Sequence, residues 1–158
     1  MSVEIRQVKA DDIELMNDLL TTFGEVFNEI NTYTAKRPSS GYMYSLLSGD
    51  SFVAIAALEG KDVVGGLAAY ELKKFEQERS EFYIYDLAVS EAYRRKGIAT
   101  ALIEKLKTIA AERGAYVIFV QADTGIEDEP AIALYTKLGV REDVLHFDIQ
   151  VSQKNKNS

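Results

Sequence analysis

Three basic residues stand immediately before the most regular helical pattern in the chain, and a glycine separates them from it. N–H groups at the start of a helix point outward with the positive end of the helix dipole, and glycine lets a ligand approach the backbone closely. The basic side chains add attraction for phosphate. The pattern therefore predicts an anion site, and a solvated basic turn is the alternative. The residues of this turn are Arg94, Arg95, Lys96, Gly97, Ile98, Ala99 and Thr100.

A second set of residues that could do chemistry is acidic. Carboxylates hold ammonium groups by charge-assisted hydrogen bonds and increase encounter rates with cations at low salt. Two of them, Glu81 and Asp86, stand in an apolar and aromatic segment at 81–89. The others follow an apolar run at 116–120 and are Asp123, Glu127, Asp128 and Glu129. We expect these carboxylates to bind a cationic substrate, and for the individual glutamates of the loop an exposed acidic surface is the alternative.

The composition excludes several kinds of chemistry. The chain has no cysteine, which rules out disulfides, thiolate metal sites and a cysteine nucleophile. Its single histidine, His146, cannot build a histidine-rich metal site, so we expect no metal, and a structural role is the alternative to its acting as a base. The net charge of −7 disfavours nucleic acid and anionic lipid and favours cationic small molecules. No apolar run approaches the roughly 18 residues of a membrane span, so the expected location is the cytoplasm.

Apolar periodicity and turn residues predict the elements that must position these groups. A helix should begin after Asp11 or Asp12, and a second short helix should end near Gly49. The segment 28–40 is polar and is predicted to be a loop. The predicted helices are 13–23, 42–47, 98–109 and 130–137, and the predicted strands are 3–8, 51–58, 63–72, 81–89, 116–120 and 144–151.

The order of these elements, β-α-α-β-β-β-α-β-α-β, is typical of a mixed α/β fold. A tight turn at 59–62 predicts an antiparallel hairpin, and the helix at 98–109 predicts a right-handed crossover to a strand covered on both faces. The 158 residues suit one domain over residues 1–151, followed by a loose polar tail at 152–158.

The basic turn resembles the pyrophosphate-binding signature of the GNAT superfamily of N-acetyltransferases, in which Arg94, Gly97 and Ala99 fill the defining positions. A second motif at 131–139 resembles the superfamily's alanine, Leu-Tyr, lysine and glycine pattern. The resemblance implies a mixed central sheet of about six strands, with an antiparallel N-terminal part and splayed central strands, and about four helices. It also implies that acetyl-coenzyme A (acetyl-CoA) is the cosubstrate. The implied pantetheine contacts are Leu87, Ala88, Val89, Asp128 and Ala131, with Asp128 standing where the superfamily often has asparagine.

Longer stretches at 63–70, 83–89, 94–107, 114–123 and 134–148 look like the aminoglycoside 3-N-acetyltransferases that modify gentamicin. The loop at 124–129 departs from that group. The resemblance implies acetylation of the 3-amino group of gentamicin-type drugs, and hence antibiotic resistance. Relatives often pair through edge strands, so residues 145–151 could contribute to a homodimer interface. An internal strand of the same sheet is the alternative for these residues.

The resemblance implies direct attack in a ternary complex, with Tyr135 as the acid that protonates the leaving thiolate. An amine must lose a proton before it attacks, and we choose Asp123 as the base, with Glu81 and Asp86 binding substrate or relaying protons through water. Two alternatives remain open. The acceptor could be another small amine, a polyamine or a protein N-terminus, or the chain could bind acetyl-CoA without catalysis.

Overall fold

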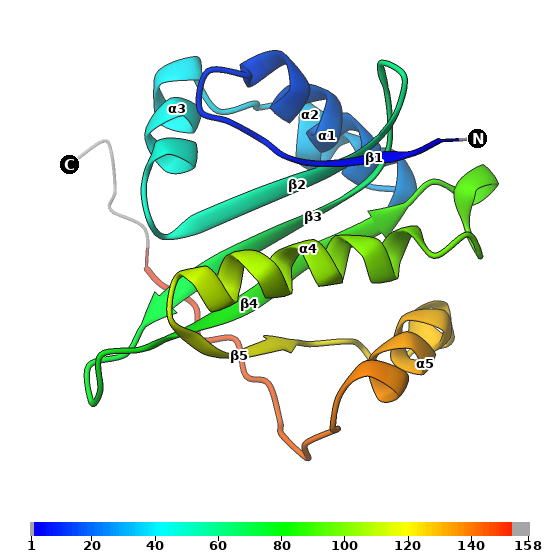
Figure 1. Cartoon of the computed structure of the whole chain (residues 1–158). Helices are drawn as coiled ribbons and strands as arrows, with labels where there is room; N and C mark the ends of the chain where they lie inside the picture. Colours follow the sequence, from blue (N-terminus) through cyan, green and yellow to red (C-terminus); the bar gives the residue numbers. More distant parts are fainter. Residues whose placement is uncertain (1, 153–158) are drawn as a thin grey trace. The chain divides into compact units, whose positions relative to one another are not determined.

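The computed structural model describes residues 2–152 and divides the chain into two compact units on either side of the Gln121–Ala122 junction (Figure 1). The first unit contains the whole sheet and four α-helices, and the second contains the last helix. The single domain expected over residues 1–151 stays a prediction. The tail expected at 152–158 lies, apart from Ser152, outside the described residues.

The first unit is a mixed five-stranded sheet in the order β1-β2-β3-β4-β5. The first four strands pair antiparallel, and β5 pairs parallel with β4 after the α4 crossover, which confirms the mixed α/β arrangement. The elements are β1 (Glu4–Gln7), α1 (Ile13–Val26), α2 (Ile30–Thr34), α3 (Ser40–Ser48), β2 (Phe52–Glu59), β3 (Asp62–Lys73), β4 (Ser80–Val89), the 3₁₀-helix η1 (Glu91–Tyr93), α4 (Ile98–Glu112) and β5 (Ala115–Val120).

Helix α1 begins directly after Asp12, one of the two N-cap residues predicted from the sequence. The Asp12 carboxylate accepts a hydrogen bond from the backbone N–H of Leu15 at 3.2 Å, so Asp12 and not Asp11 is the N-cap. Leu15, Met16, Leu19 and Phe23 recur at helical spacing and are buried. This stripe packs α1 onto the sheet.

Helices cover both faces of the sheet. A core cluster joins α1 and α3 to Phe52, Ala54 and Ala56 of β2, and it includes no residue of α4. The alternate residues of β2 point to the other face because side chains of a strand alternate, and α4 packs there, in front of β4 in the view of Figure 1. Both faces of the central strands are therefore covered, which agrees with their near-continuous burial.

Two adjacent glycines of β3 allow close packing at the middle of the sheet. A Cβ on Gly66 would lie 2.1 Å from Leu19 Cδ1, so only glycine lets α1 lie this close to β3. A Cβ on Gly65 would lie 2.8 Å from the carbonyl oxygen of Ala88 on β4. The glycine pair therefore fixes the position of α1 and of the end of β4 together.

One segment expected to be a loop contains a helix. Residues 28–40 include α2 (Ile30–Thr34), and the ring of Tyr33 packs against Phe23 and Phe27, each at 6.0 Å between centroids. The polar composition of this segment gave no helical pattern, so tertiary packing of one aromatic residue decides the local structure.

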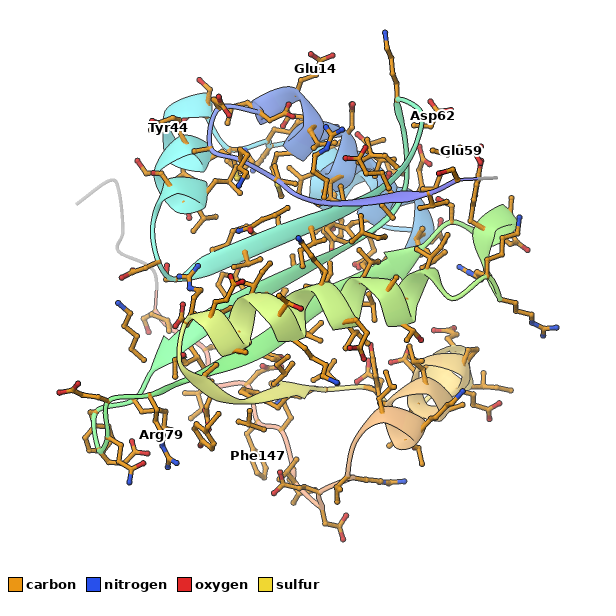
Figure 2. The ribbon with its side chains drawn as sticks, in the orientation of Figure 1. Glu14, Tyr44, Glu59, Asp62, Arg79 and Phe147 are labelled. Carbon is orange, nitrogen blue, oxygen red and sulfur yellow. The ribbon has the colours of Figure 1, made fainter. Side chains whose placement is uncertain are left out.

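One strand prediction near the carboxyl end is wrong, and another strand is present but not in the central position expected for it. Residues 144–151 form no strand, because nothing among residues 2–152 pairs with them, and Phe147, labelled in Figure 2, is 77% exposed. The strand at 116–120 is present as β5, but it lies at the edge of the sheet instead of being covered on both faces. Tyr116 and Val117 are accordingly 48% and 41% exposed. An apolar run shows that a segment can enter a sheet, and only a paired neighbour makes it an interior strand.

No helix among residues 2–152 is both long and apolar enough to cross a membrane.

An ion pair connects the sheet to the residue that follows α4. Arg113 Nη2 lies 2.6 Å from Glu71 Oε1 of β3, and the two side chains are 26% and 4% exposed. A carboxylate this deeply buried needs its cation, since removing one partner leaves an uncompensated charge. The pair therefore holds the end of α4 against β3.

We expect Arg113→Ala to lower the free energy of unfolding by about 3 kcal/mol, because it leaves the Glu71 carboxylate buried without its cationic partner. The measurement is denaturant unfolding beside Lys107→Ala, which removes an exposed pair with Glu104 and should cost less than about 0.5 kcal/mol. Equal losses in the two variants would show that burial of Glu71 carries no special cost.

Candidate active site

The main geometric feature of the sheet is the point where β4 and β5 part. Parallel pairing runs from Ser80↔Ala115 to Ile84↔Val120, while β4 continues to Val89. In the part of the chain that the structure describes, the last five residues of β4 have no partner on the β5 side, and the last four of them pair with β3. Their other edge presents backbone N–H and C=O groups that an extended ligand can pair with.

A bulge lies at the same place on β4. Ala69 pairs with Ile84 and Ala68 pairs with Asp86, so Tyr85 is an extra residue in the ladder between β3 and β4. Bulges bend a strand and turn its side chains toward a new direction. The bulge therefore changes the direction in which the side chains of Tyr85 and Asp86 point. These two residues come immediately before the predicted pantetheine segment of Leu87, Ala88 and Val89.

The basic turn has the geometry of an anion site. Arg95 and Gly97 have positive φ angles of 62° and 79°, and Gly97 is the N-cap of α4 without any side-chain cap. The first N–H groups of this 15-residue helix are therefore left for another acceptor. The Arg94 Nε–H donates to the carbonyl oxygen of Val89 at 3.0 Å, which ties the turn to the open end of β4.

A hollow of about 270 Å³ adjoins the turn. The turn residues themselves are mostly exposed, so their charges face solvent. The hollow is lined by Val3, Ile5, Lys96, Gly97, Ile98 and Ala101. The start of α4 thus has open space beside it on the β1 side.

The two predicted carboxylates of β4 have different partners. Glu81 accepts a hydrogen bond from the Tyr116 hydroxyl at 2.5 Å and pairs with Lys74 Nζ at 3.6 Å. Asp86 accepts one from the Tyr33 hydroxyl at 2.9 Å. The structure does not bring the two together, since they stand five positions apart along β4, a distance of roughly 16 Å. Glu81 is satisfied within the sheet, whereas Asp86 is at the open end.

Rings form a row on the sheet face that carries α1 and α2. The row crosses four strands, with centroid distances of 5.3 Å from Phe52 to Tyr70, 5.7 Å from Tyr70 to Tyr85, 5.8 Å from Tyr85 to Tyr83 and 4.8 Å from Tyr83 to Phe119. We call these five residues the aromatic row. The alternation of Tyr83 and Tyr85 was the only sign of it in the sequence, and Tyr33 beside it lay in a predicted loop.

The second unit contains the 3₁₀-helix η2 (Ile126–Asp128) and α5 (Glu129–Leu138). Asp128 Oδ2 accepts a hydrogen bond from the backbone N–H of Asp123 at 2.8 Å, so this carboxylate closes the loop before α5. Asp128 is half-buried, whereas Asp123, Glu127 and Glu129 are exposed. The structure thus brings Asp123 and Asp128 together and leaves the two glutamates in solvent.

Tyr135 lies on α5, one helical turn after Ala131, and both are half-buried. Burial, followed by the negative charge of Asp128, raises the pKa of the Tyr135 phenol. The phenol is therefore fully protonated at neutral pH, which a proton donor requires.

Among residues 2–152, no group of three or more histidine, aspartate and glutamate side chains could hold a metal ion. His146 is exposed, and its Nε2 lies 2.9 Å from Oδ1 of Asp148.

These features together define an acetyltransferase-like sheet with a split edge and an uncapped helix after it. The acetyltransferase (GNAT) family model matches residues 13–140, so the chain belongs to the GNAT family.

Solved structures give more specific similarity. The chain is 68% identical to an aminoglycoside acetyltransferase from an uncultured soil metagenomic sample, covering 96% of this chain and 100% of that one, with a TM-score of 0.94. A second aminoglycoside acetyltransferase from such a sample, in complex with sisomicin, is 30% identical with a TM-score of 0.85, covering 95% and 97% of the two chains.

Curated relatives are more distant. An N-alpha-acetyltransferase of Saccharolobus solfataricus is 39% identical over 61 residues, which is 38% of this chain and 35% of the relative. N-acetyltransferase 8 of Mus musculus is 27% identical over 139 residues, which is 76% of this chain and 60% of the relative. The chain thus spans between a third and three fifths of these relatives' length.

We expect Gly97→Ala to weaken CoA binding about tenfold, because alanine is strained at positive φ by about 1 kcal/mol and its Cβ obstructs ligand approach to the backbone. Gly60→Ala is the matched control. Both glycines have positive φ and open space around a Cβ, but Gly60 lies in the β2–β3 turn. Isothermal titration calorimetry with CoA is the measurement, and equal affinities for the two variants would argue against an anion site at the turn.

Proposed function

We propose that the chain transfers the acetyl group of acetyl-CoA to an amine of an aminoglycoside. The observation that carries the proposal is the 68% identity, over nearly the whole of both chains, to an aminoglycoside acetyltransferase. The finer part of the proposal is that the 3-amino group of gentamicin-type drugs is acetylated, which would confer resistance. The resemblance of residues 63–70, 83–89 and 134–148 to gentamicin 3-N-acetyltransferases supports that part.

Within the first unit, the proposed roles follow from backbone geometry. The uncapped N–H groups after Gly97 would bind the pyrophosphate of the cosubstrate, with Arg94, Arg95 and Lys96 adding charge. The free edge of β4 at Leu87, Ala88 and Val89 would pair with the pantetheine arm. A backbone N–H near Ala88 or Val89 would polarise the thioester carbonyl.

The proposed reaction is a direct displacement. The acceptor nitrogen loses a proton to a carboxylate, for which we propose Asp123, and its lone pair attacks the thioester carbon. A new C–N bond forms as the C–S bond breaks, and the Tyr135 phenol protonates the departing thiolate. Because Tyr135 stays protonated at neutral pH, it suits this step.

Thiol release from acetyl-CoA tests the proposal, with gentamicin, sisomicin, spermidine and no acceptor compared side by side. NMR of the gentamicin product identifies the acetylated nitrogen. Turnover of the two drugs supports an aminoglycoside acetyltransferase, and acetylation at another position refutes only the 3-amino assignment. Turnover of spermidine alone favours a polyamine enzyme, and tight CoA binding without turnover favours a non-catalytic module.

Tyr135→Phe removes only the phenolic hydroxyl, and we expect it to lower kcat about a hundredfold, as loss of a general acid does. Tyr44→Phe, an exposed position on α3 labelled in Figure 2, is the control and should leave kcat unchanged.

The pH profile provides a second test of this role. The protonated phenol is the active form and its pKa is raised, so the contribution of Tyr135 to wild-type kcat should be lost only above pH ~10, and Tyr135→Phe should lack this alkaline decline. An unchanged kcat in Tyr135→Phe would remove Tyr135 from the mechanism.

A further inference from the structure

Tyr93 is the one residue of the segment 91–97 that is not exposed. It ends the 3₁₀-helix η1 and stands directly before the basic turn. The charged residues that follow it, Arg94, Arg95 and Lys96, all face solvent. An exposed segment has few contacts of its own to hold its shape. The side chain of Tyr93 is therefore the place where this segment is attached to the rest of the first unit.

The Tyr93 hydroxyl connects the segment to a distant part of the sheet. It donates a hydrogen bond to Oε1 of Glu59 at 2.6 Å, across 34 positions of the sequence. Glu59, labelled in Figure 2, is half-buried, ends β2 and pairs with Asp62 across the β2–β3 turn. The bond to Glu59 raises the pKa of the Tyr93 phenol, so the hydroxyl remains a donor at neutral pH. The β2–β3 hairpin thus provides a fixed anchor for the basic turn.

The basic turn needs such an anchor because its backbone is strained. Arg95 has a φ of 62°, a left-handed conformation that a residue with a Cβ rarely adopts. Gly97, two positions later, has a φ of 79°. Conformations of this kind persist only where surrounding contacts fix them. The hydrogen bond from Arg94 to Val89 is one such contact, and the bond of the Tyr93 hydroxyl is another.

The ring of Tyr93 also places one of the cations of the turn. Lys96 Nζ lies 5.4 Å from the centroid of this ring, within the range of a cation–π contact. Because the hydroxyl of the same ring is bound to Glu59, the ring and the ammonium group are both held relative to the sheet. Lys96 remains exposed, so its charge is still accessible to an anion.

We propose that the Glu59–Tyr93 hydrogen bond holds the basic turn in the conformation that binds the diphosphate of acetyl-CoA. Glu59 and Tyr93 are thus positioning residues, which act through the turn and not by contact with the cosubstrate. This inference rests on the proposed function, because it takes the basic turn as the pyrophosphate site. A turn that spends a smaller fraction of time in its binding conformation binds its ligand more weakly by that fraction.

The charge of Glu59 separates positioning from electrostatics. A carboxylate near an anion site repels the anion, so attraction does not explain an acidic residue here. Glutamine at this position keeps an oxygen that accepts the Tyr93 hydroxyl and removes the charge. Glu59→Gln should therefore bind CoA at least as tightly as the wild type, whereas Glu59→Ala removes the acceptor and should bind more weakly.

Calorimetric titration with CoA tests the proposal. Tyr93→Phe keeps the ring and removes only the hydroxyl, and we expect it to raise Kd about fivefold, as Glu59→Ala should. The double variant should show the same fivefold loss and not the product of the two, because both residues act through one bond. Tyr116→Phe is the matched control. The Tyr116 hydroxyl bonds Glu81 near the start of β4, away from the turn, and its loss should leave Kd unchanged.

Steady-state kinetics give a readout that a general loss of structure would not produce. Tyr93→Phe should raise the KM for acetyl-CoA about fivefold while kcat with sisomicin changes little, as for a loss of uniform binding. S-acetylpantetheine carries the thioester without the diphosphate. Its kcat/KM should therefore be the same in Tyr93→Phe and in the wild type.

The outcomes separate this proposal from the proposed function. The positioning role is overturned, and the transferase left standing, by an unchanged Kd in Tyr93→Phe, by equal losses in Glu59→Gln and Glu59→Ala, or by an equal loss in Tyr116→Phe. A loss with S-acetylpantetheine as large as that with acetyl-CoA has the same meaning. The expected Kd values without turnover of any amine by the wild type support the positioning role and overturn the transferase. No binding of CoA by the wild type overturns both.

Discussion

The separation of β4 from β5 is the constraint on which the rest of the first unit depends. A strand in the middle of a sheet is hydrogen-bonded to a neighbour along both edges, and β4 is paired in this way only as far as Ile84. From Asp86 to Val89 it stays paired with β3 and keeps one edge free. The split thus leaves backbone N–H and C=O groups with which the proposed pantetheine arm can pair.

The free edge can be used only if β4 is held rigidly from the other side. The Gly65–Gly66 pair lets β3 and α1 approach so closely that the end of β4 has little room to shift. The Arg113–Glu71 pair holds the end of α4 against β3, and α4 begins at the basic turn. Helix, turn and strand edge are thus parts of one packed scaffold, which gives binding groups fixed positions.

Carboxylates on one sheet serve different purposes according to their partners. Glu71 and Glu81 have basic side chains of the same unit within reach, and their charge is neutralised on folding. Asp86 accepts a hydrogen bond from the Tyr33 phenol instead and has no basic partner among the described residues. The net charge of −7 adds a general attraction for cationic ligands.

The sequence by itself determined the features that depend on neighbours along the chain: the Asp12 cap, the α4 repeat, the β2–β3 turn and the glycine of the basic turn. Each follows from local geometry, as the left-handed φ of Gly97 shows. Tertiary structure alone decided the edge position of β5, the missing strand at 144–151, the bulge at Tyr85 and the Tyr33–Asp86 bond. These depend on which distant segments meet, and a pattern of apolar residues specifies a buried face without specifying its partner.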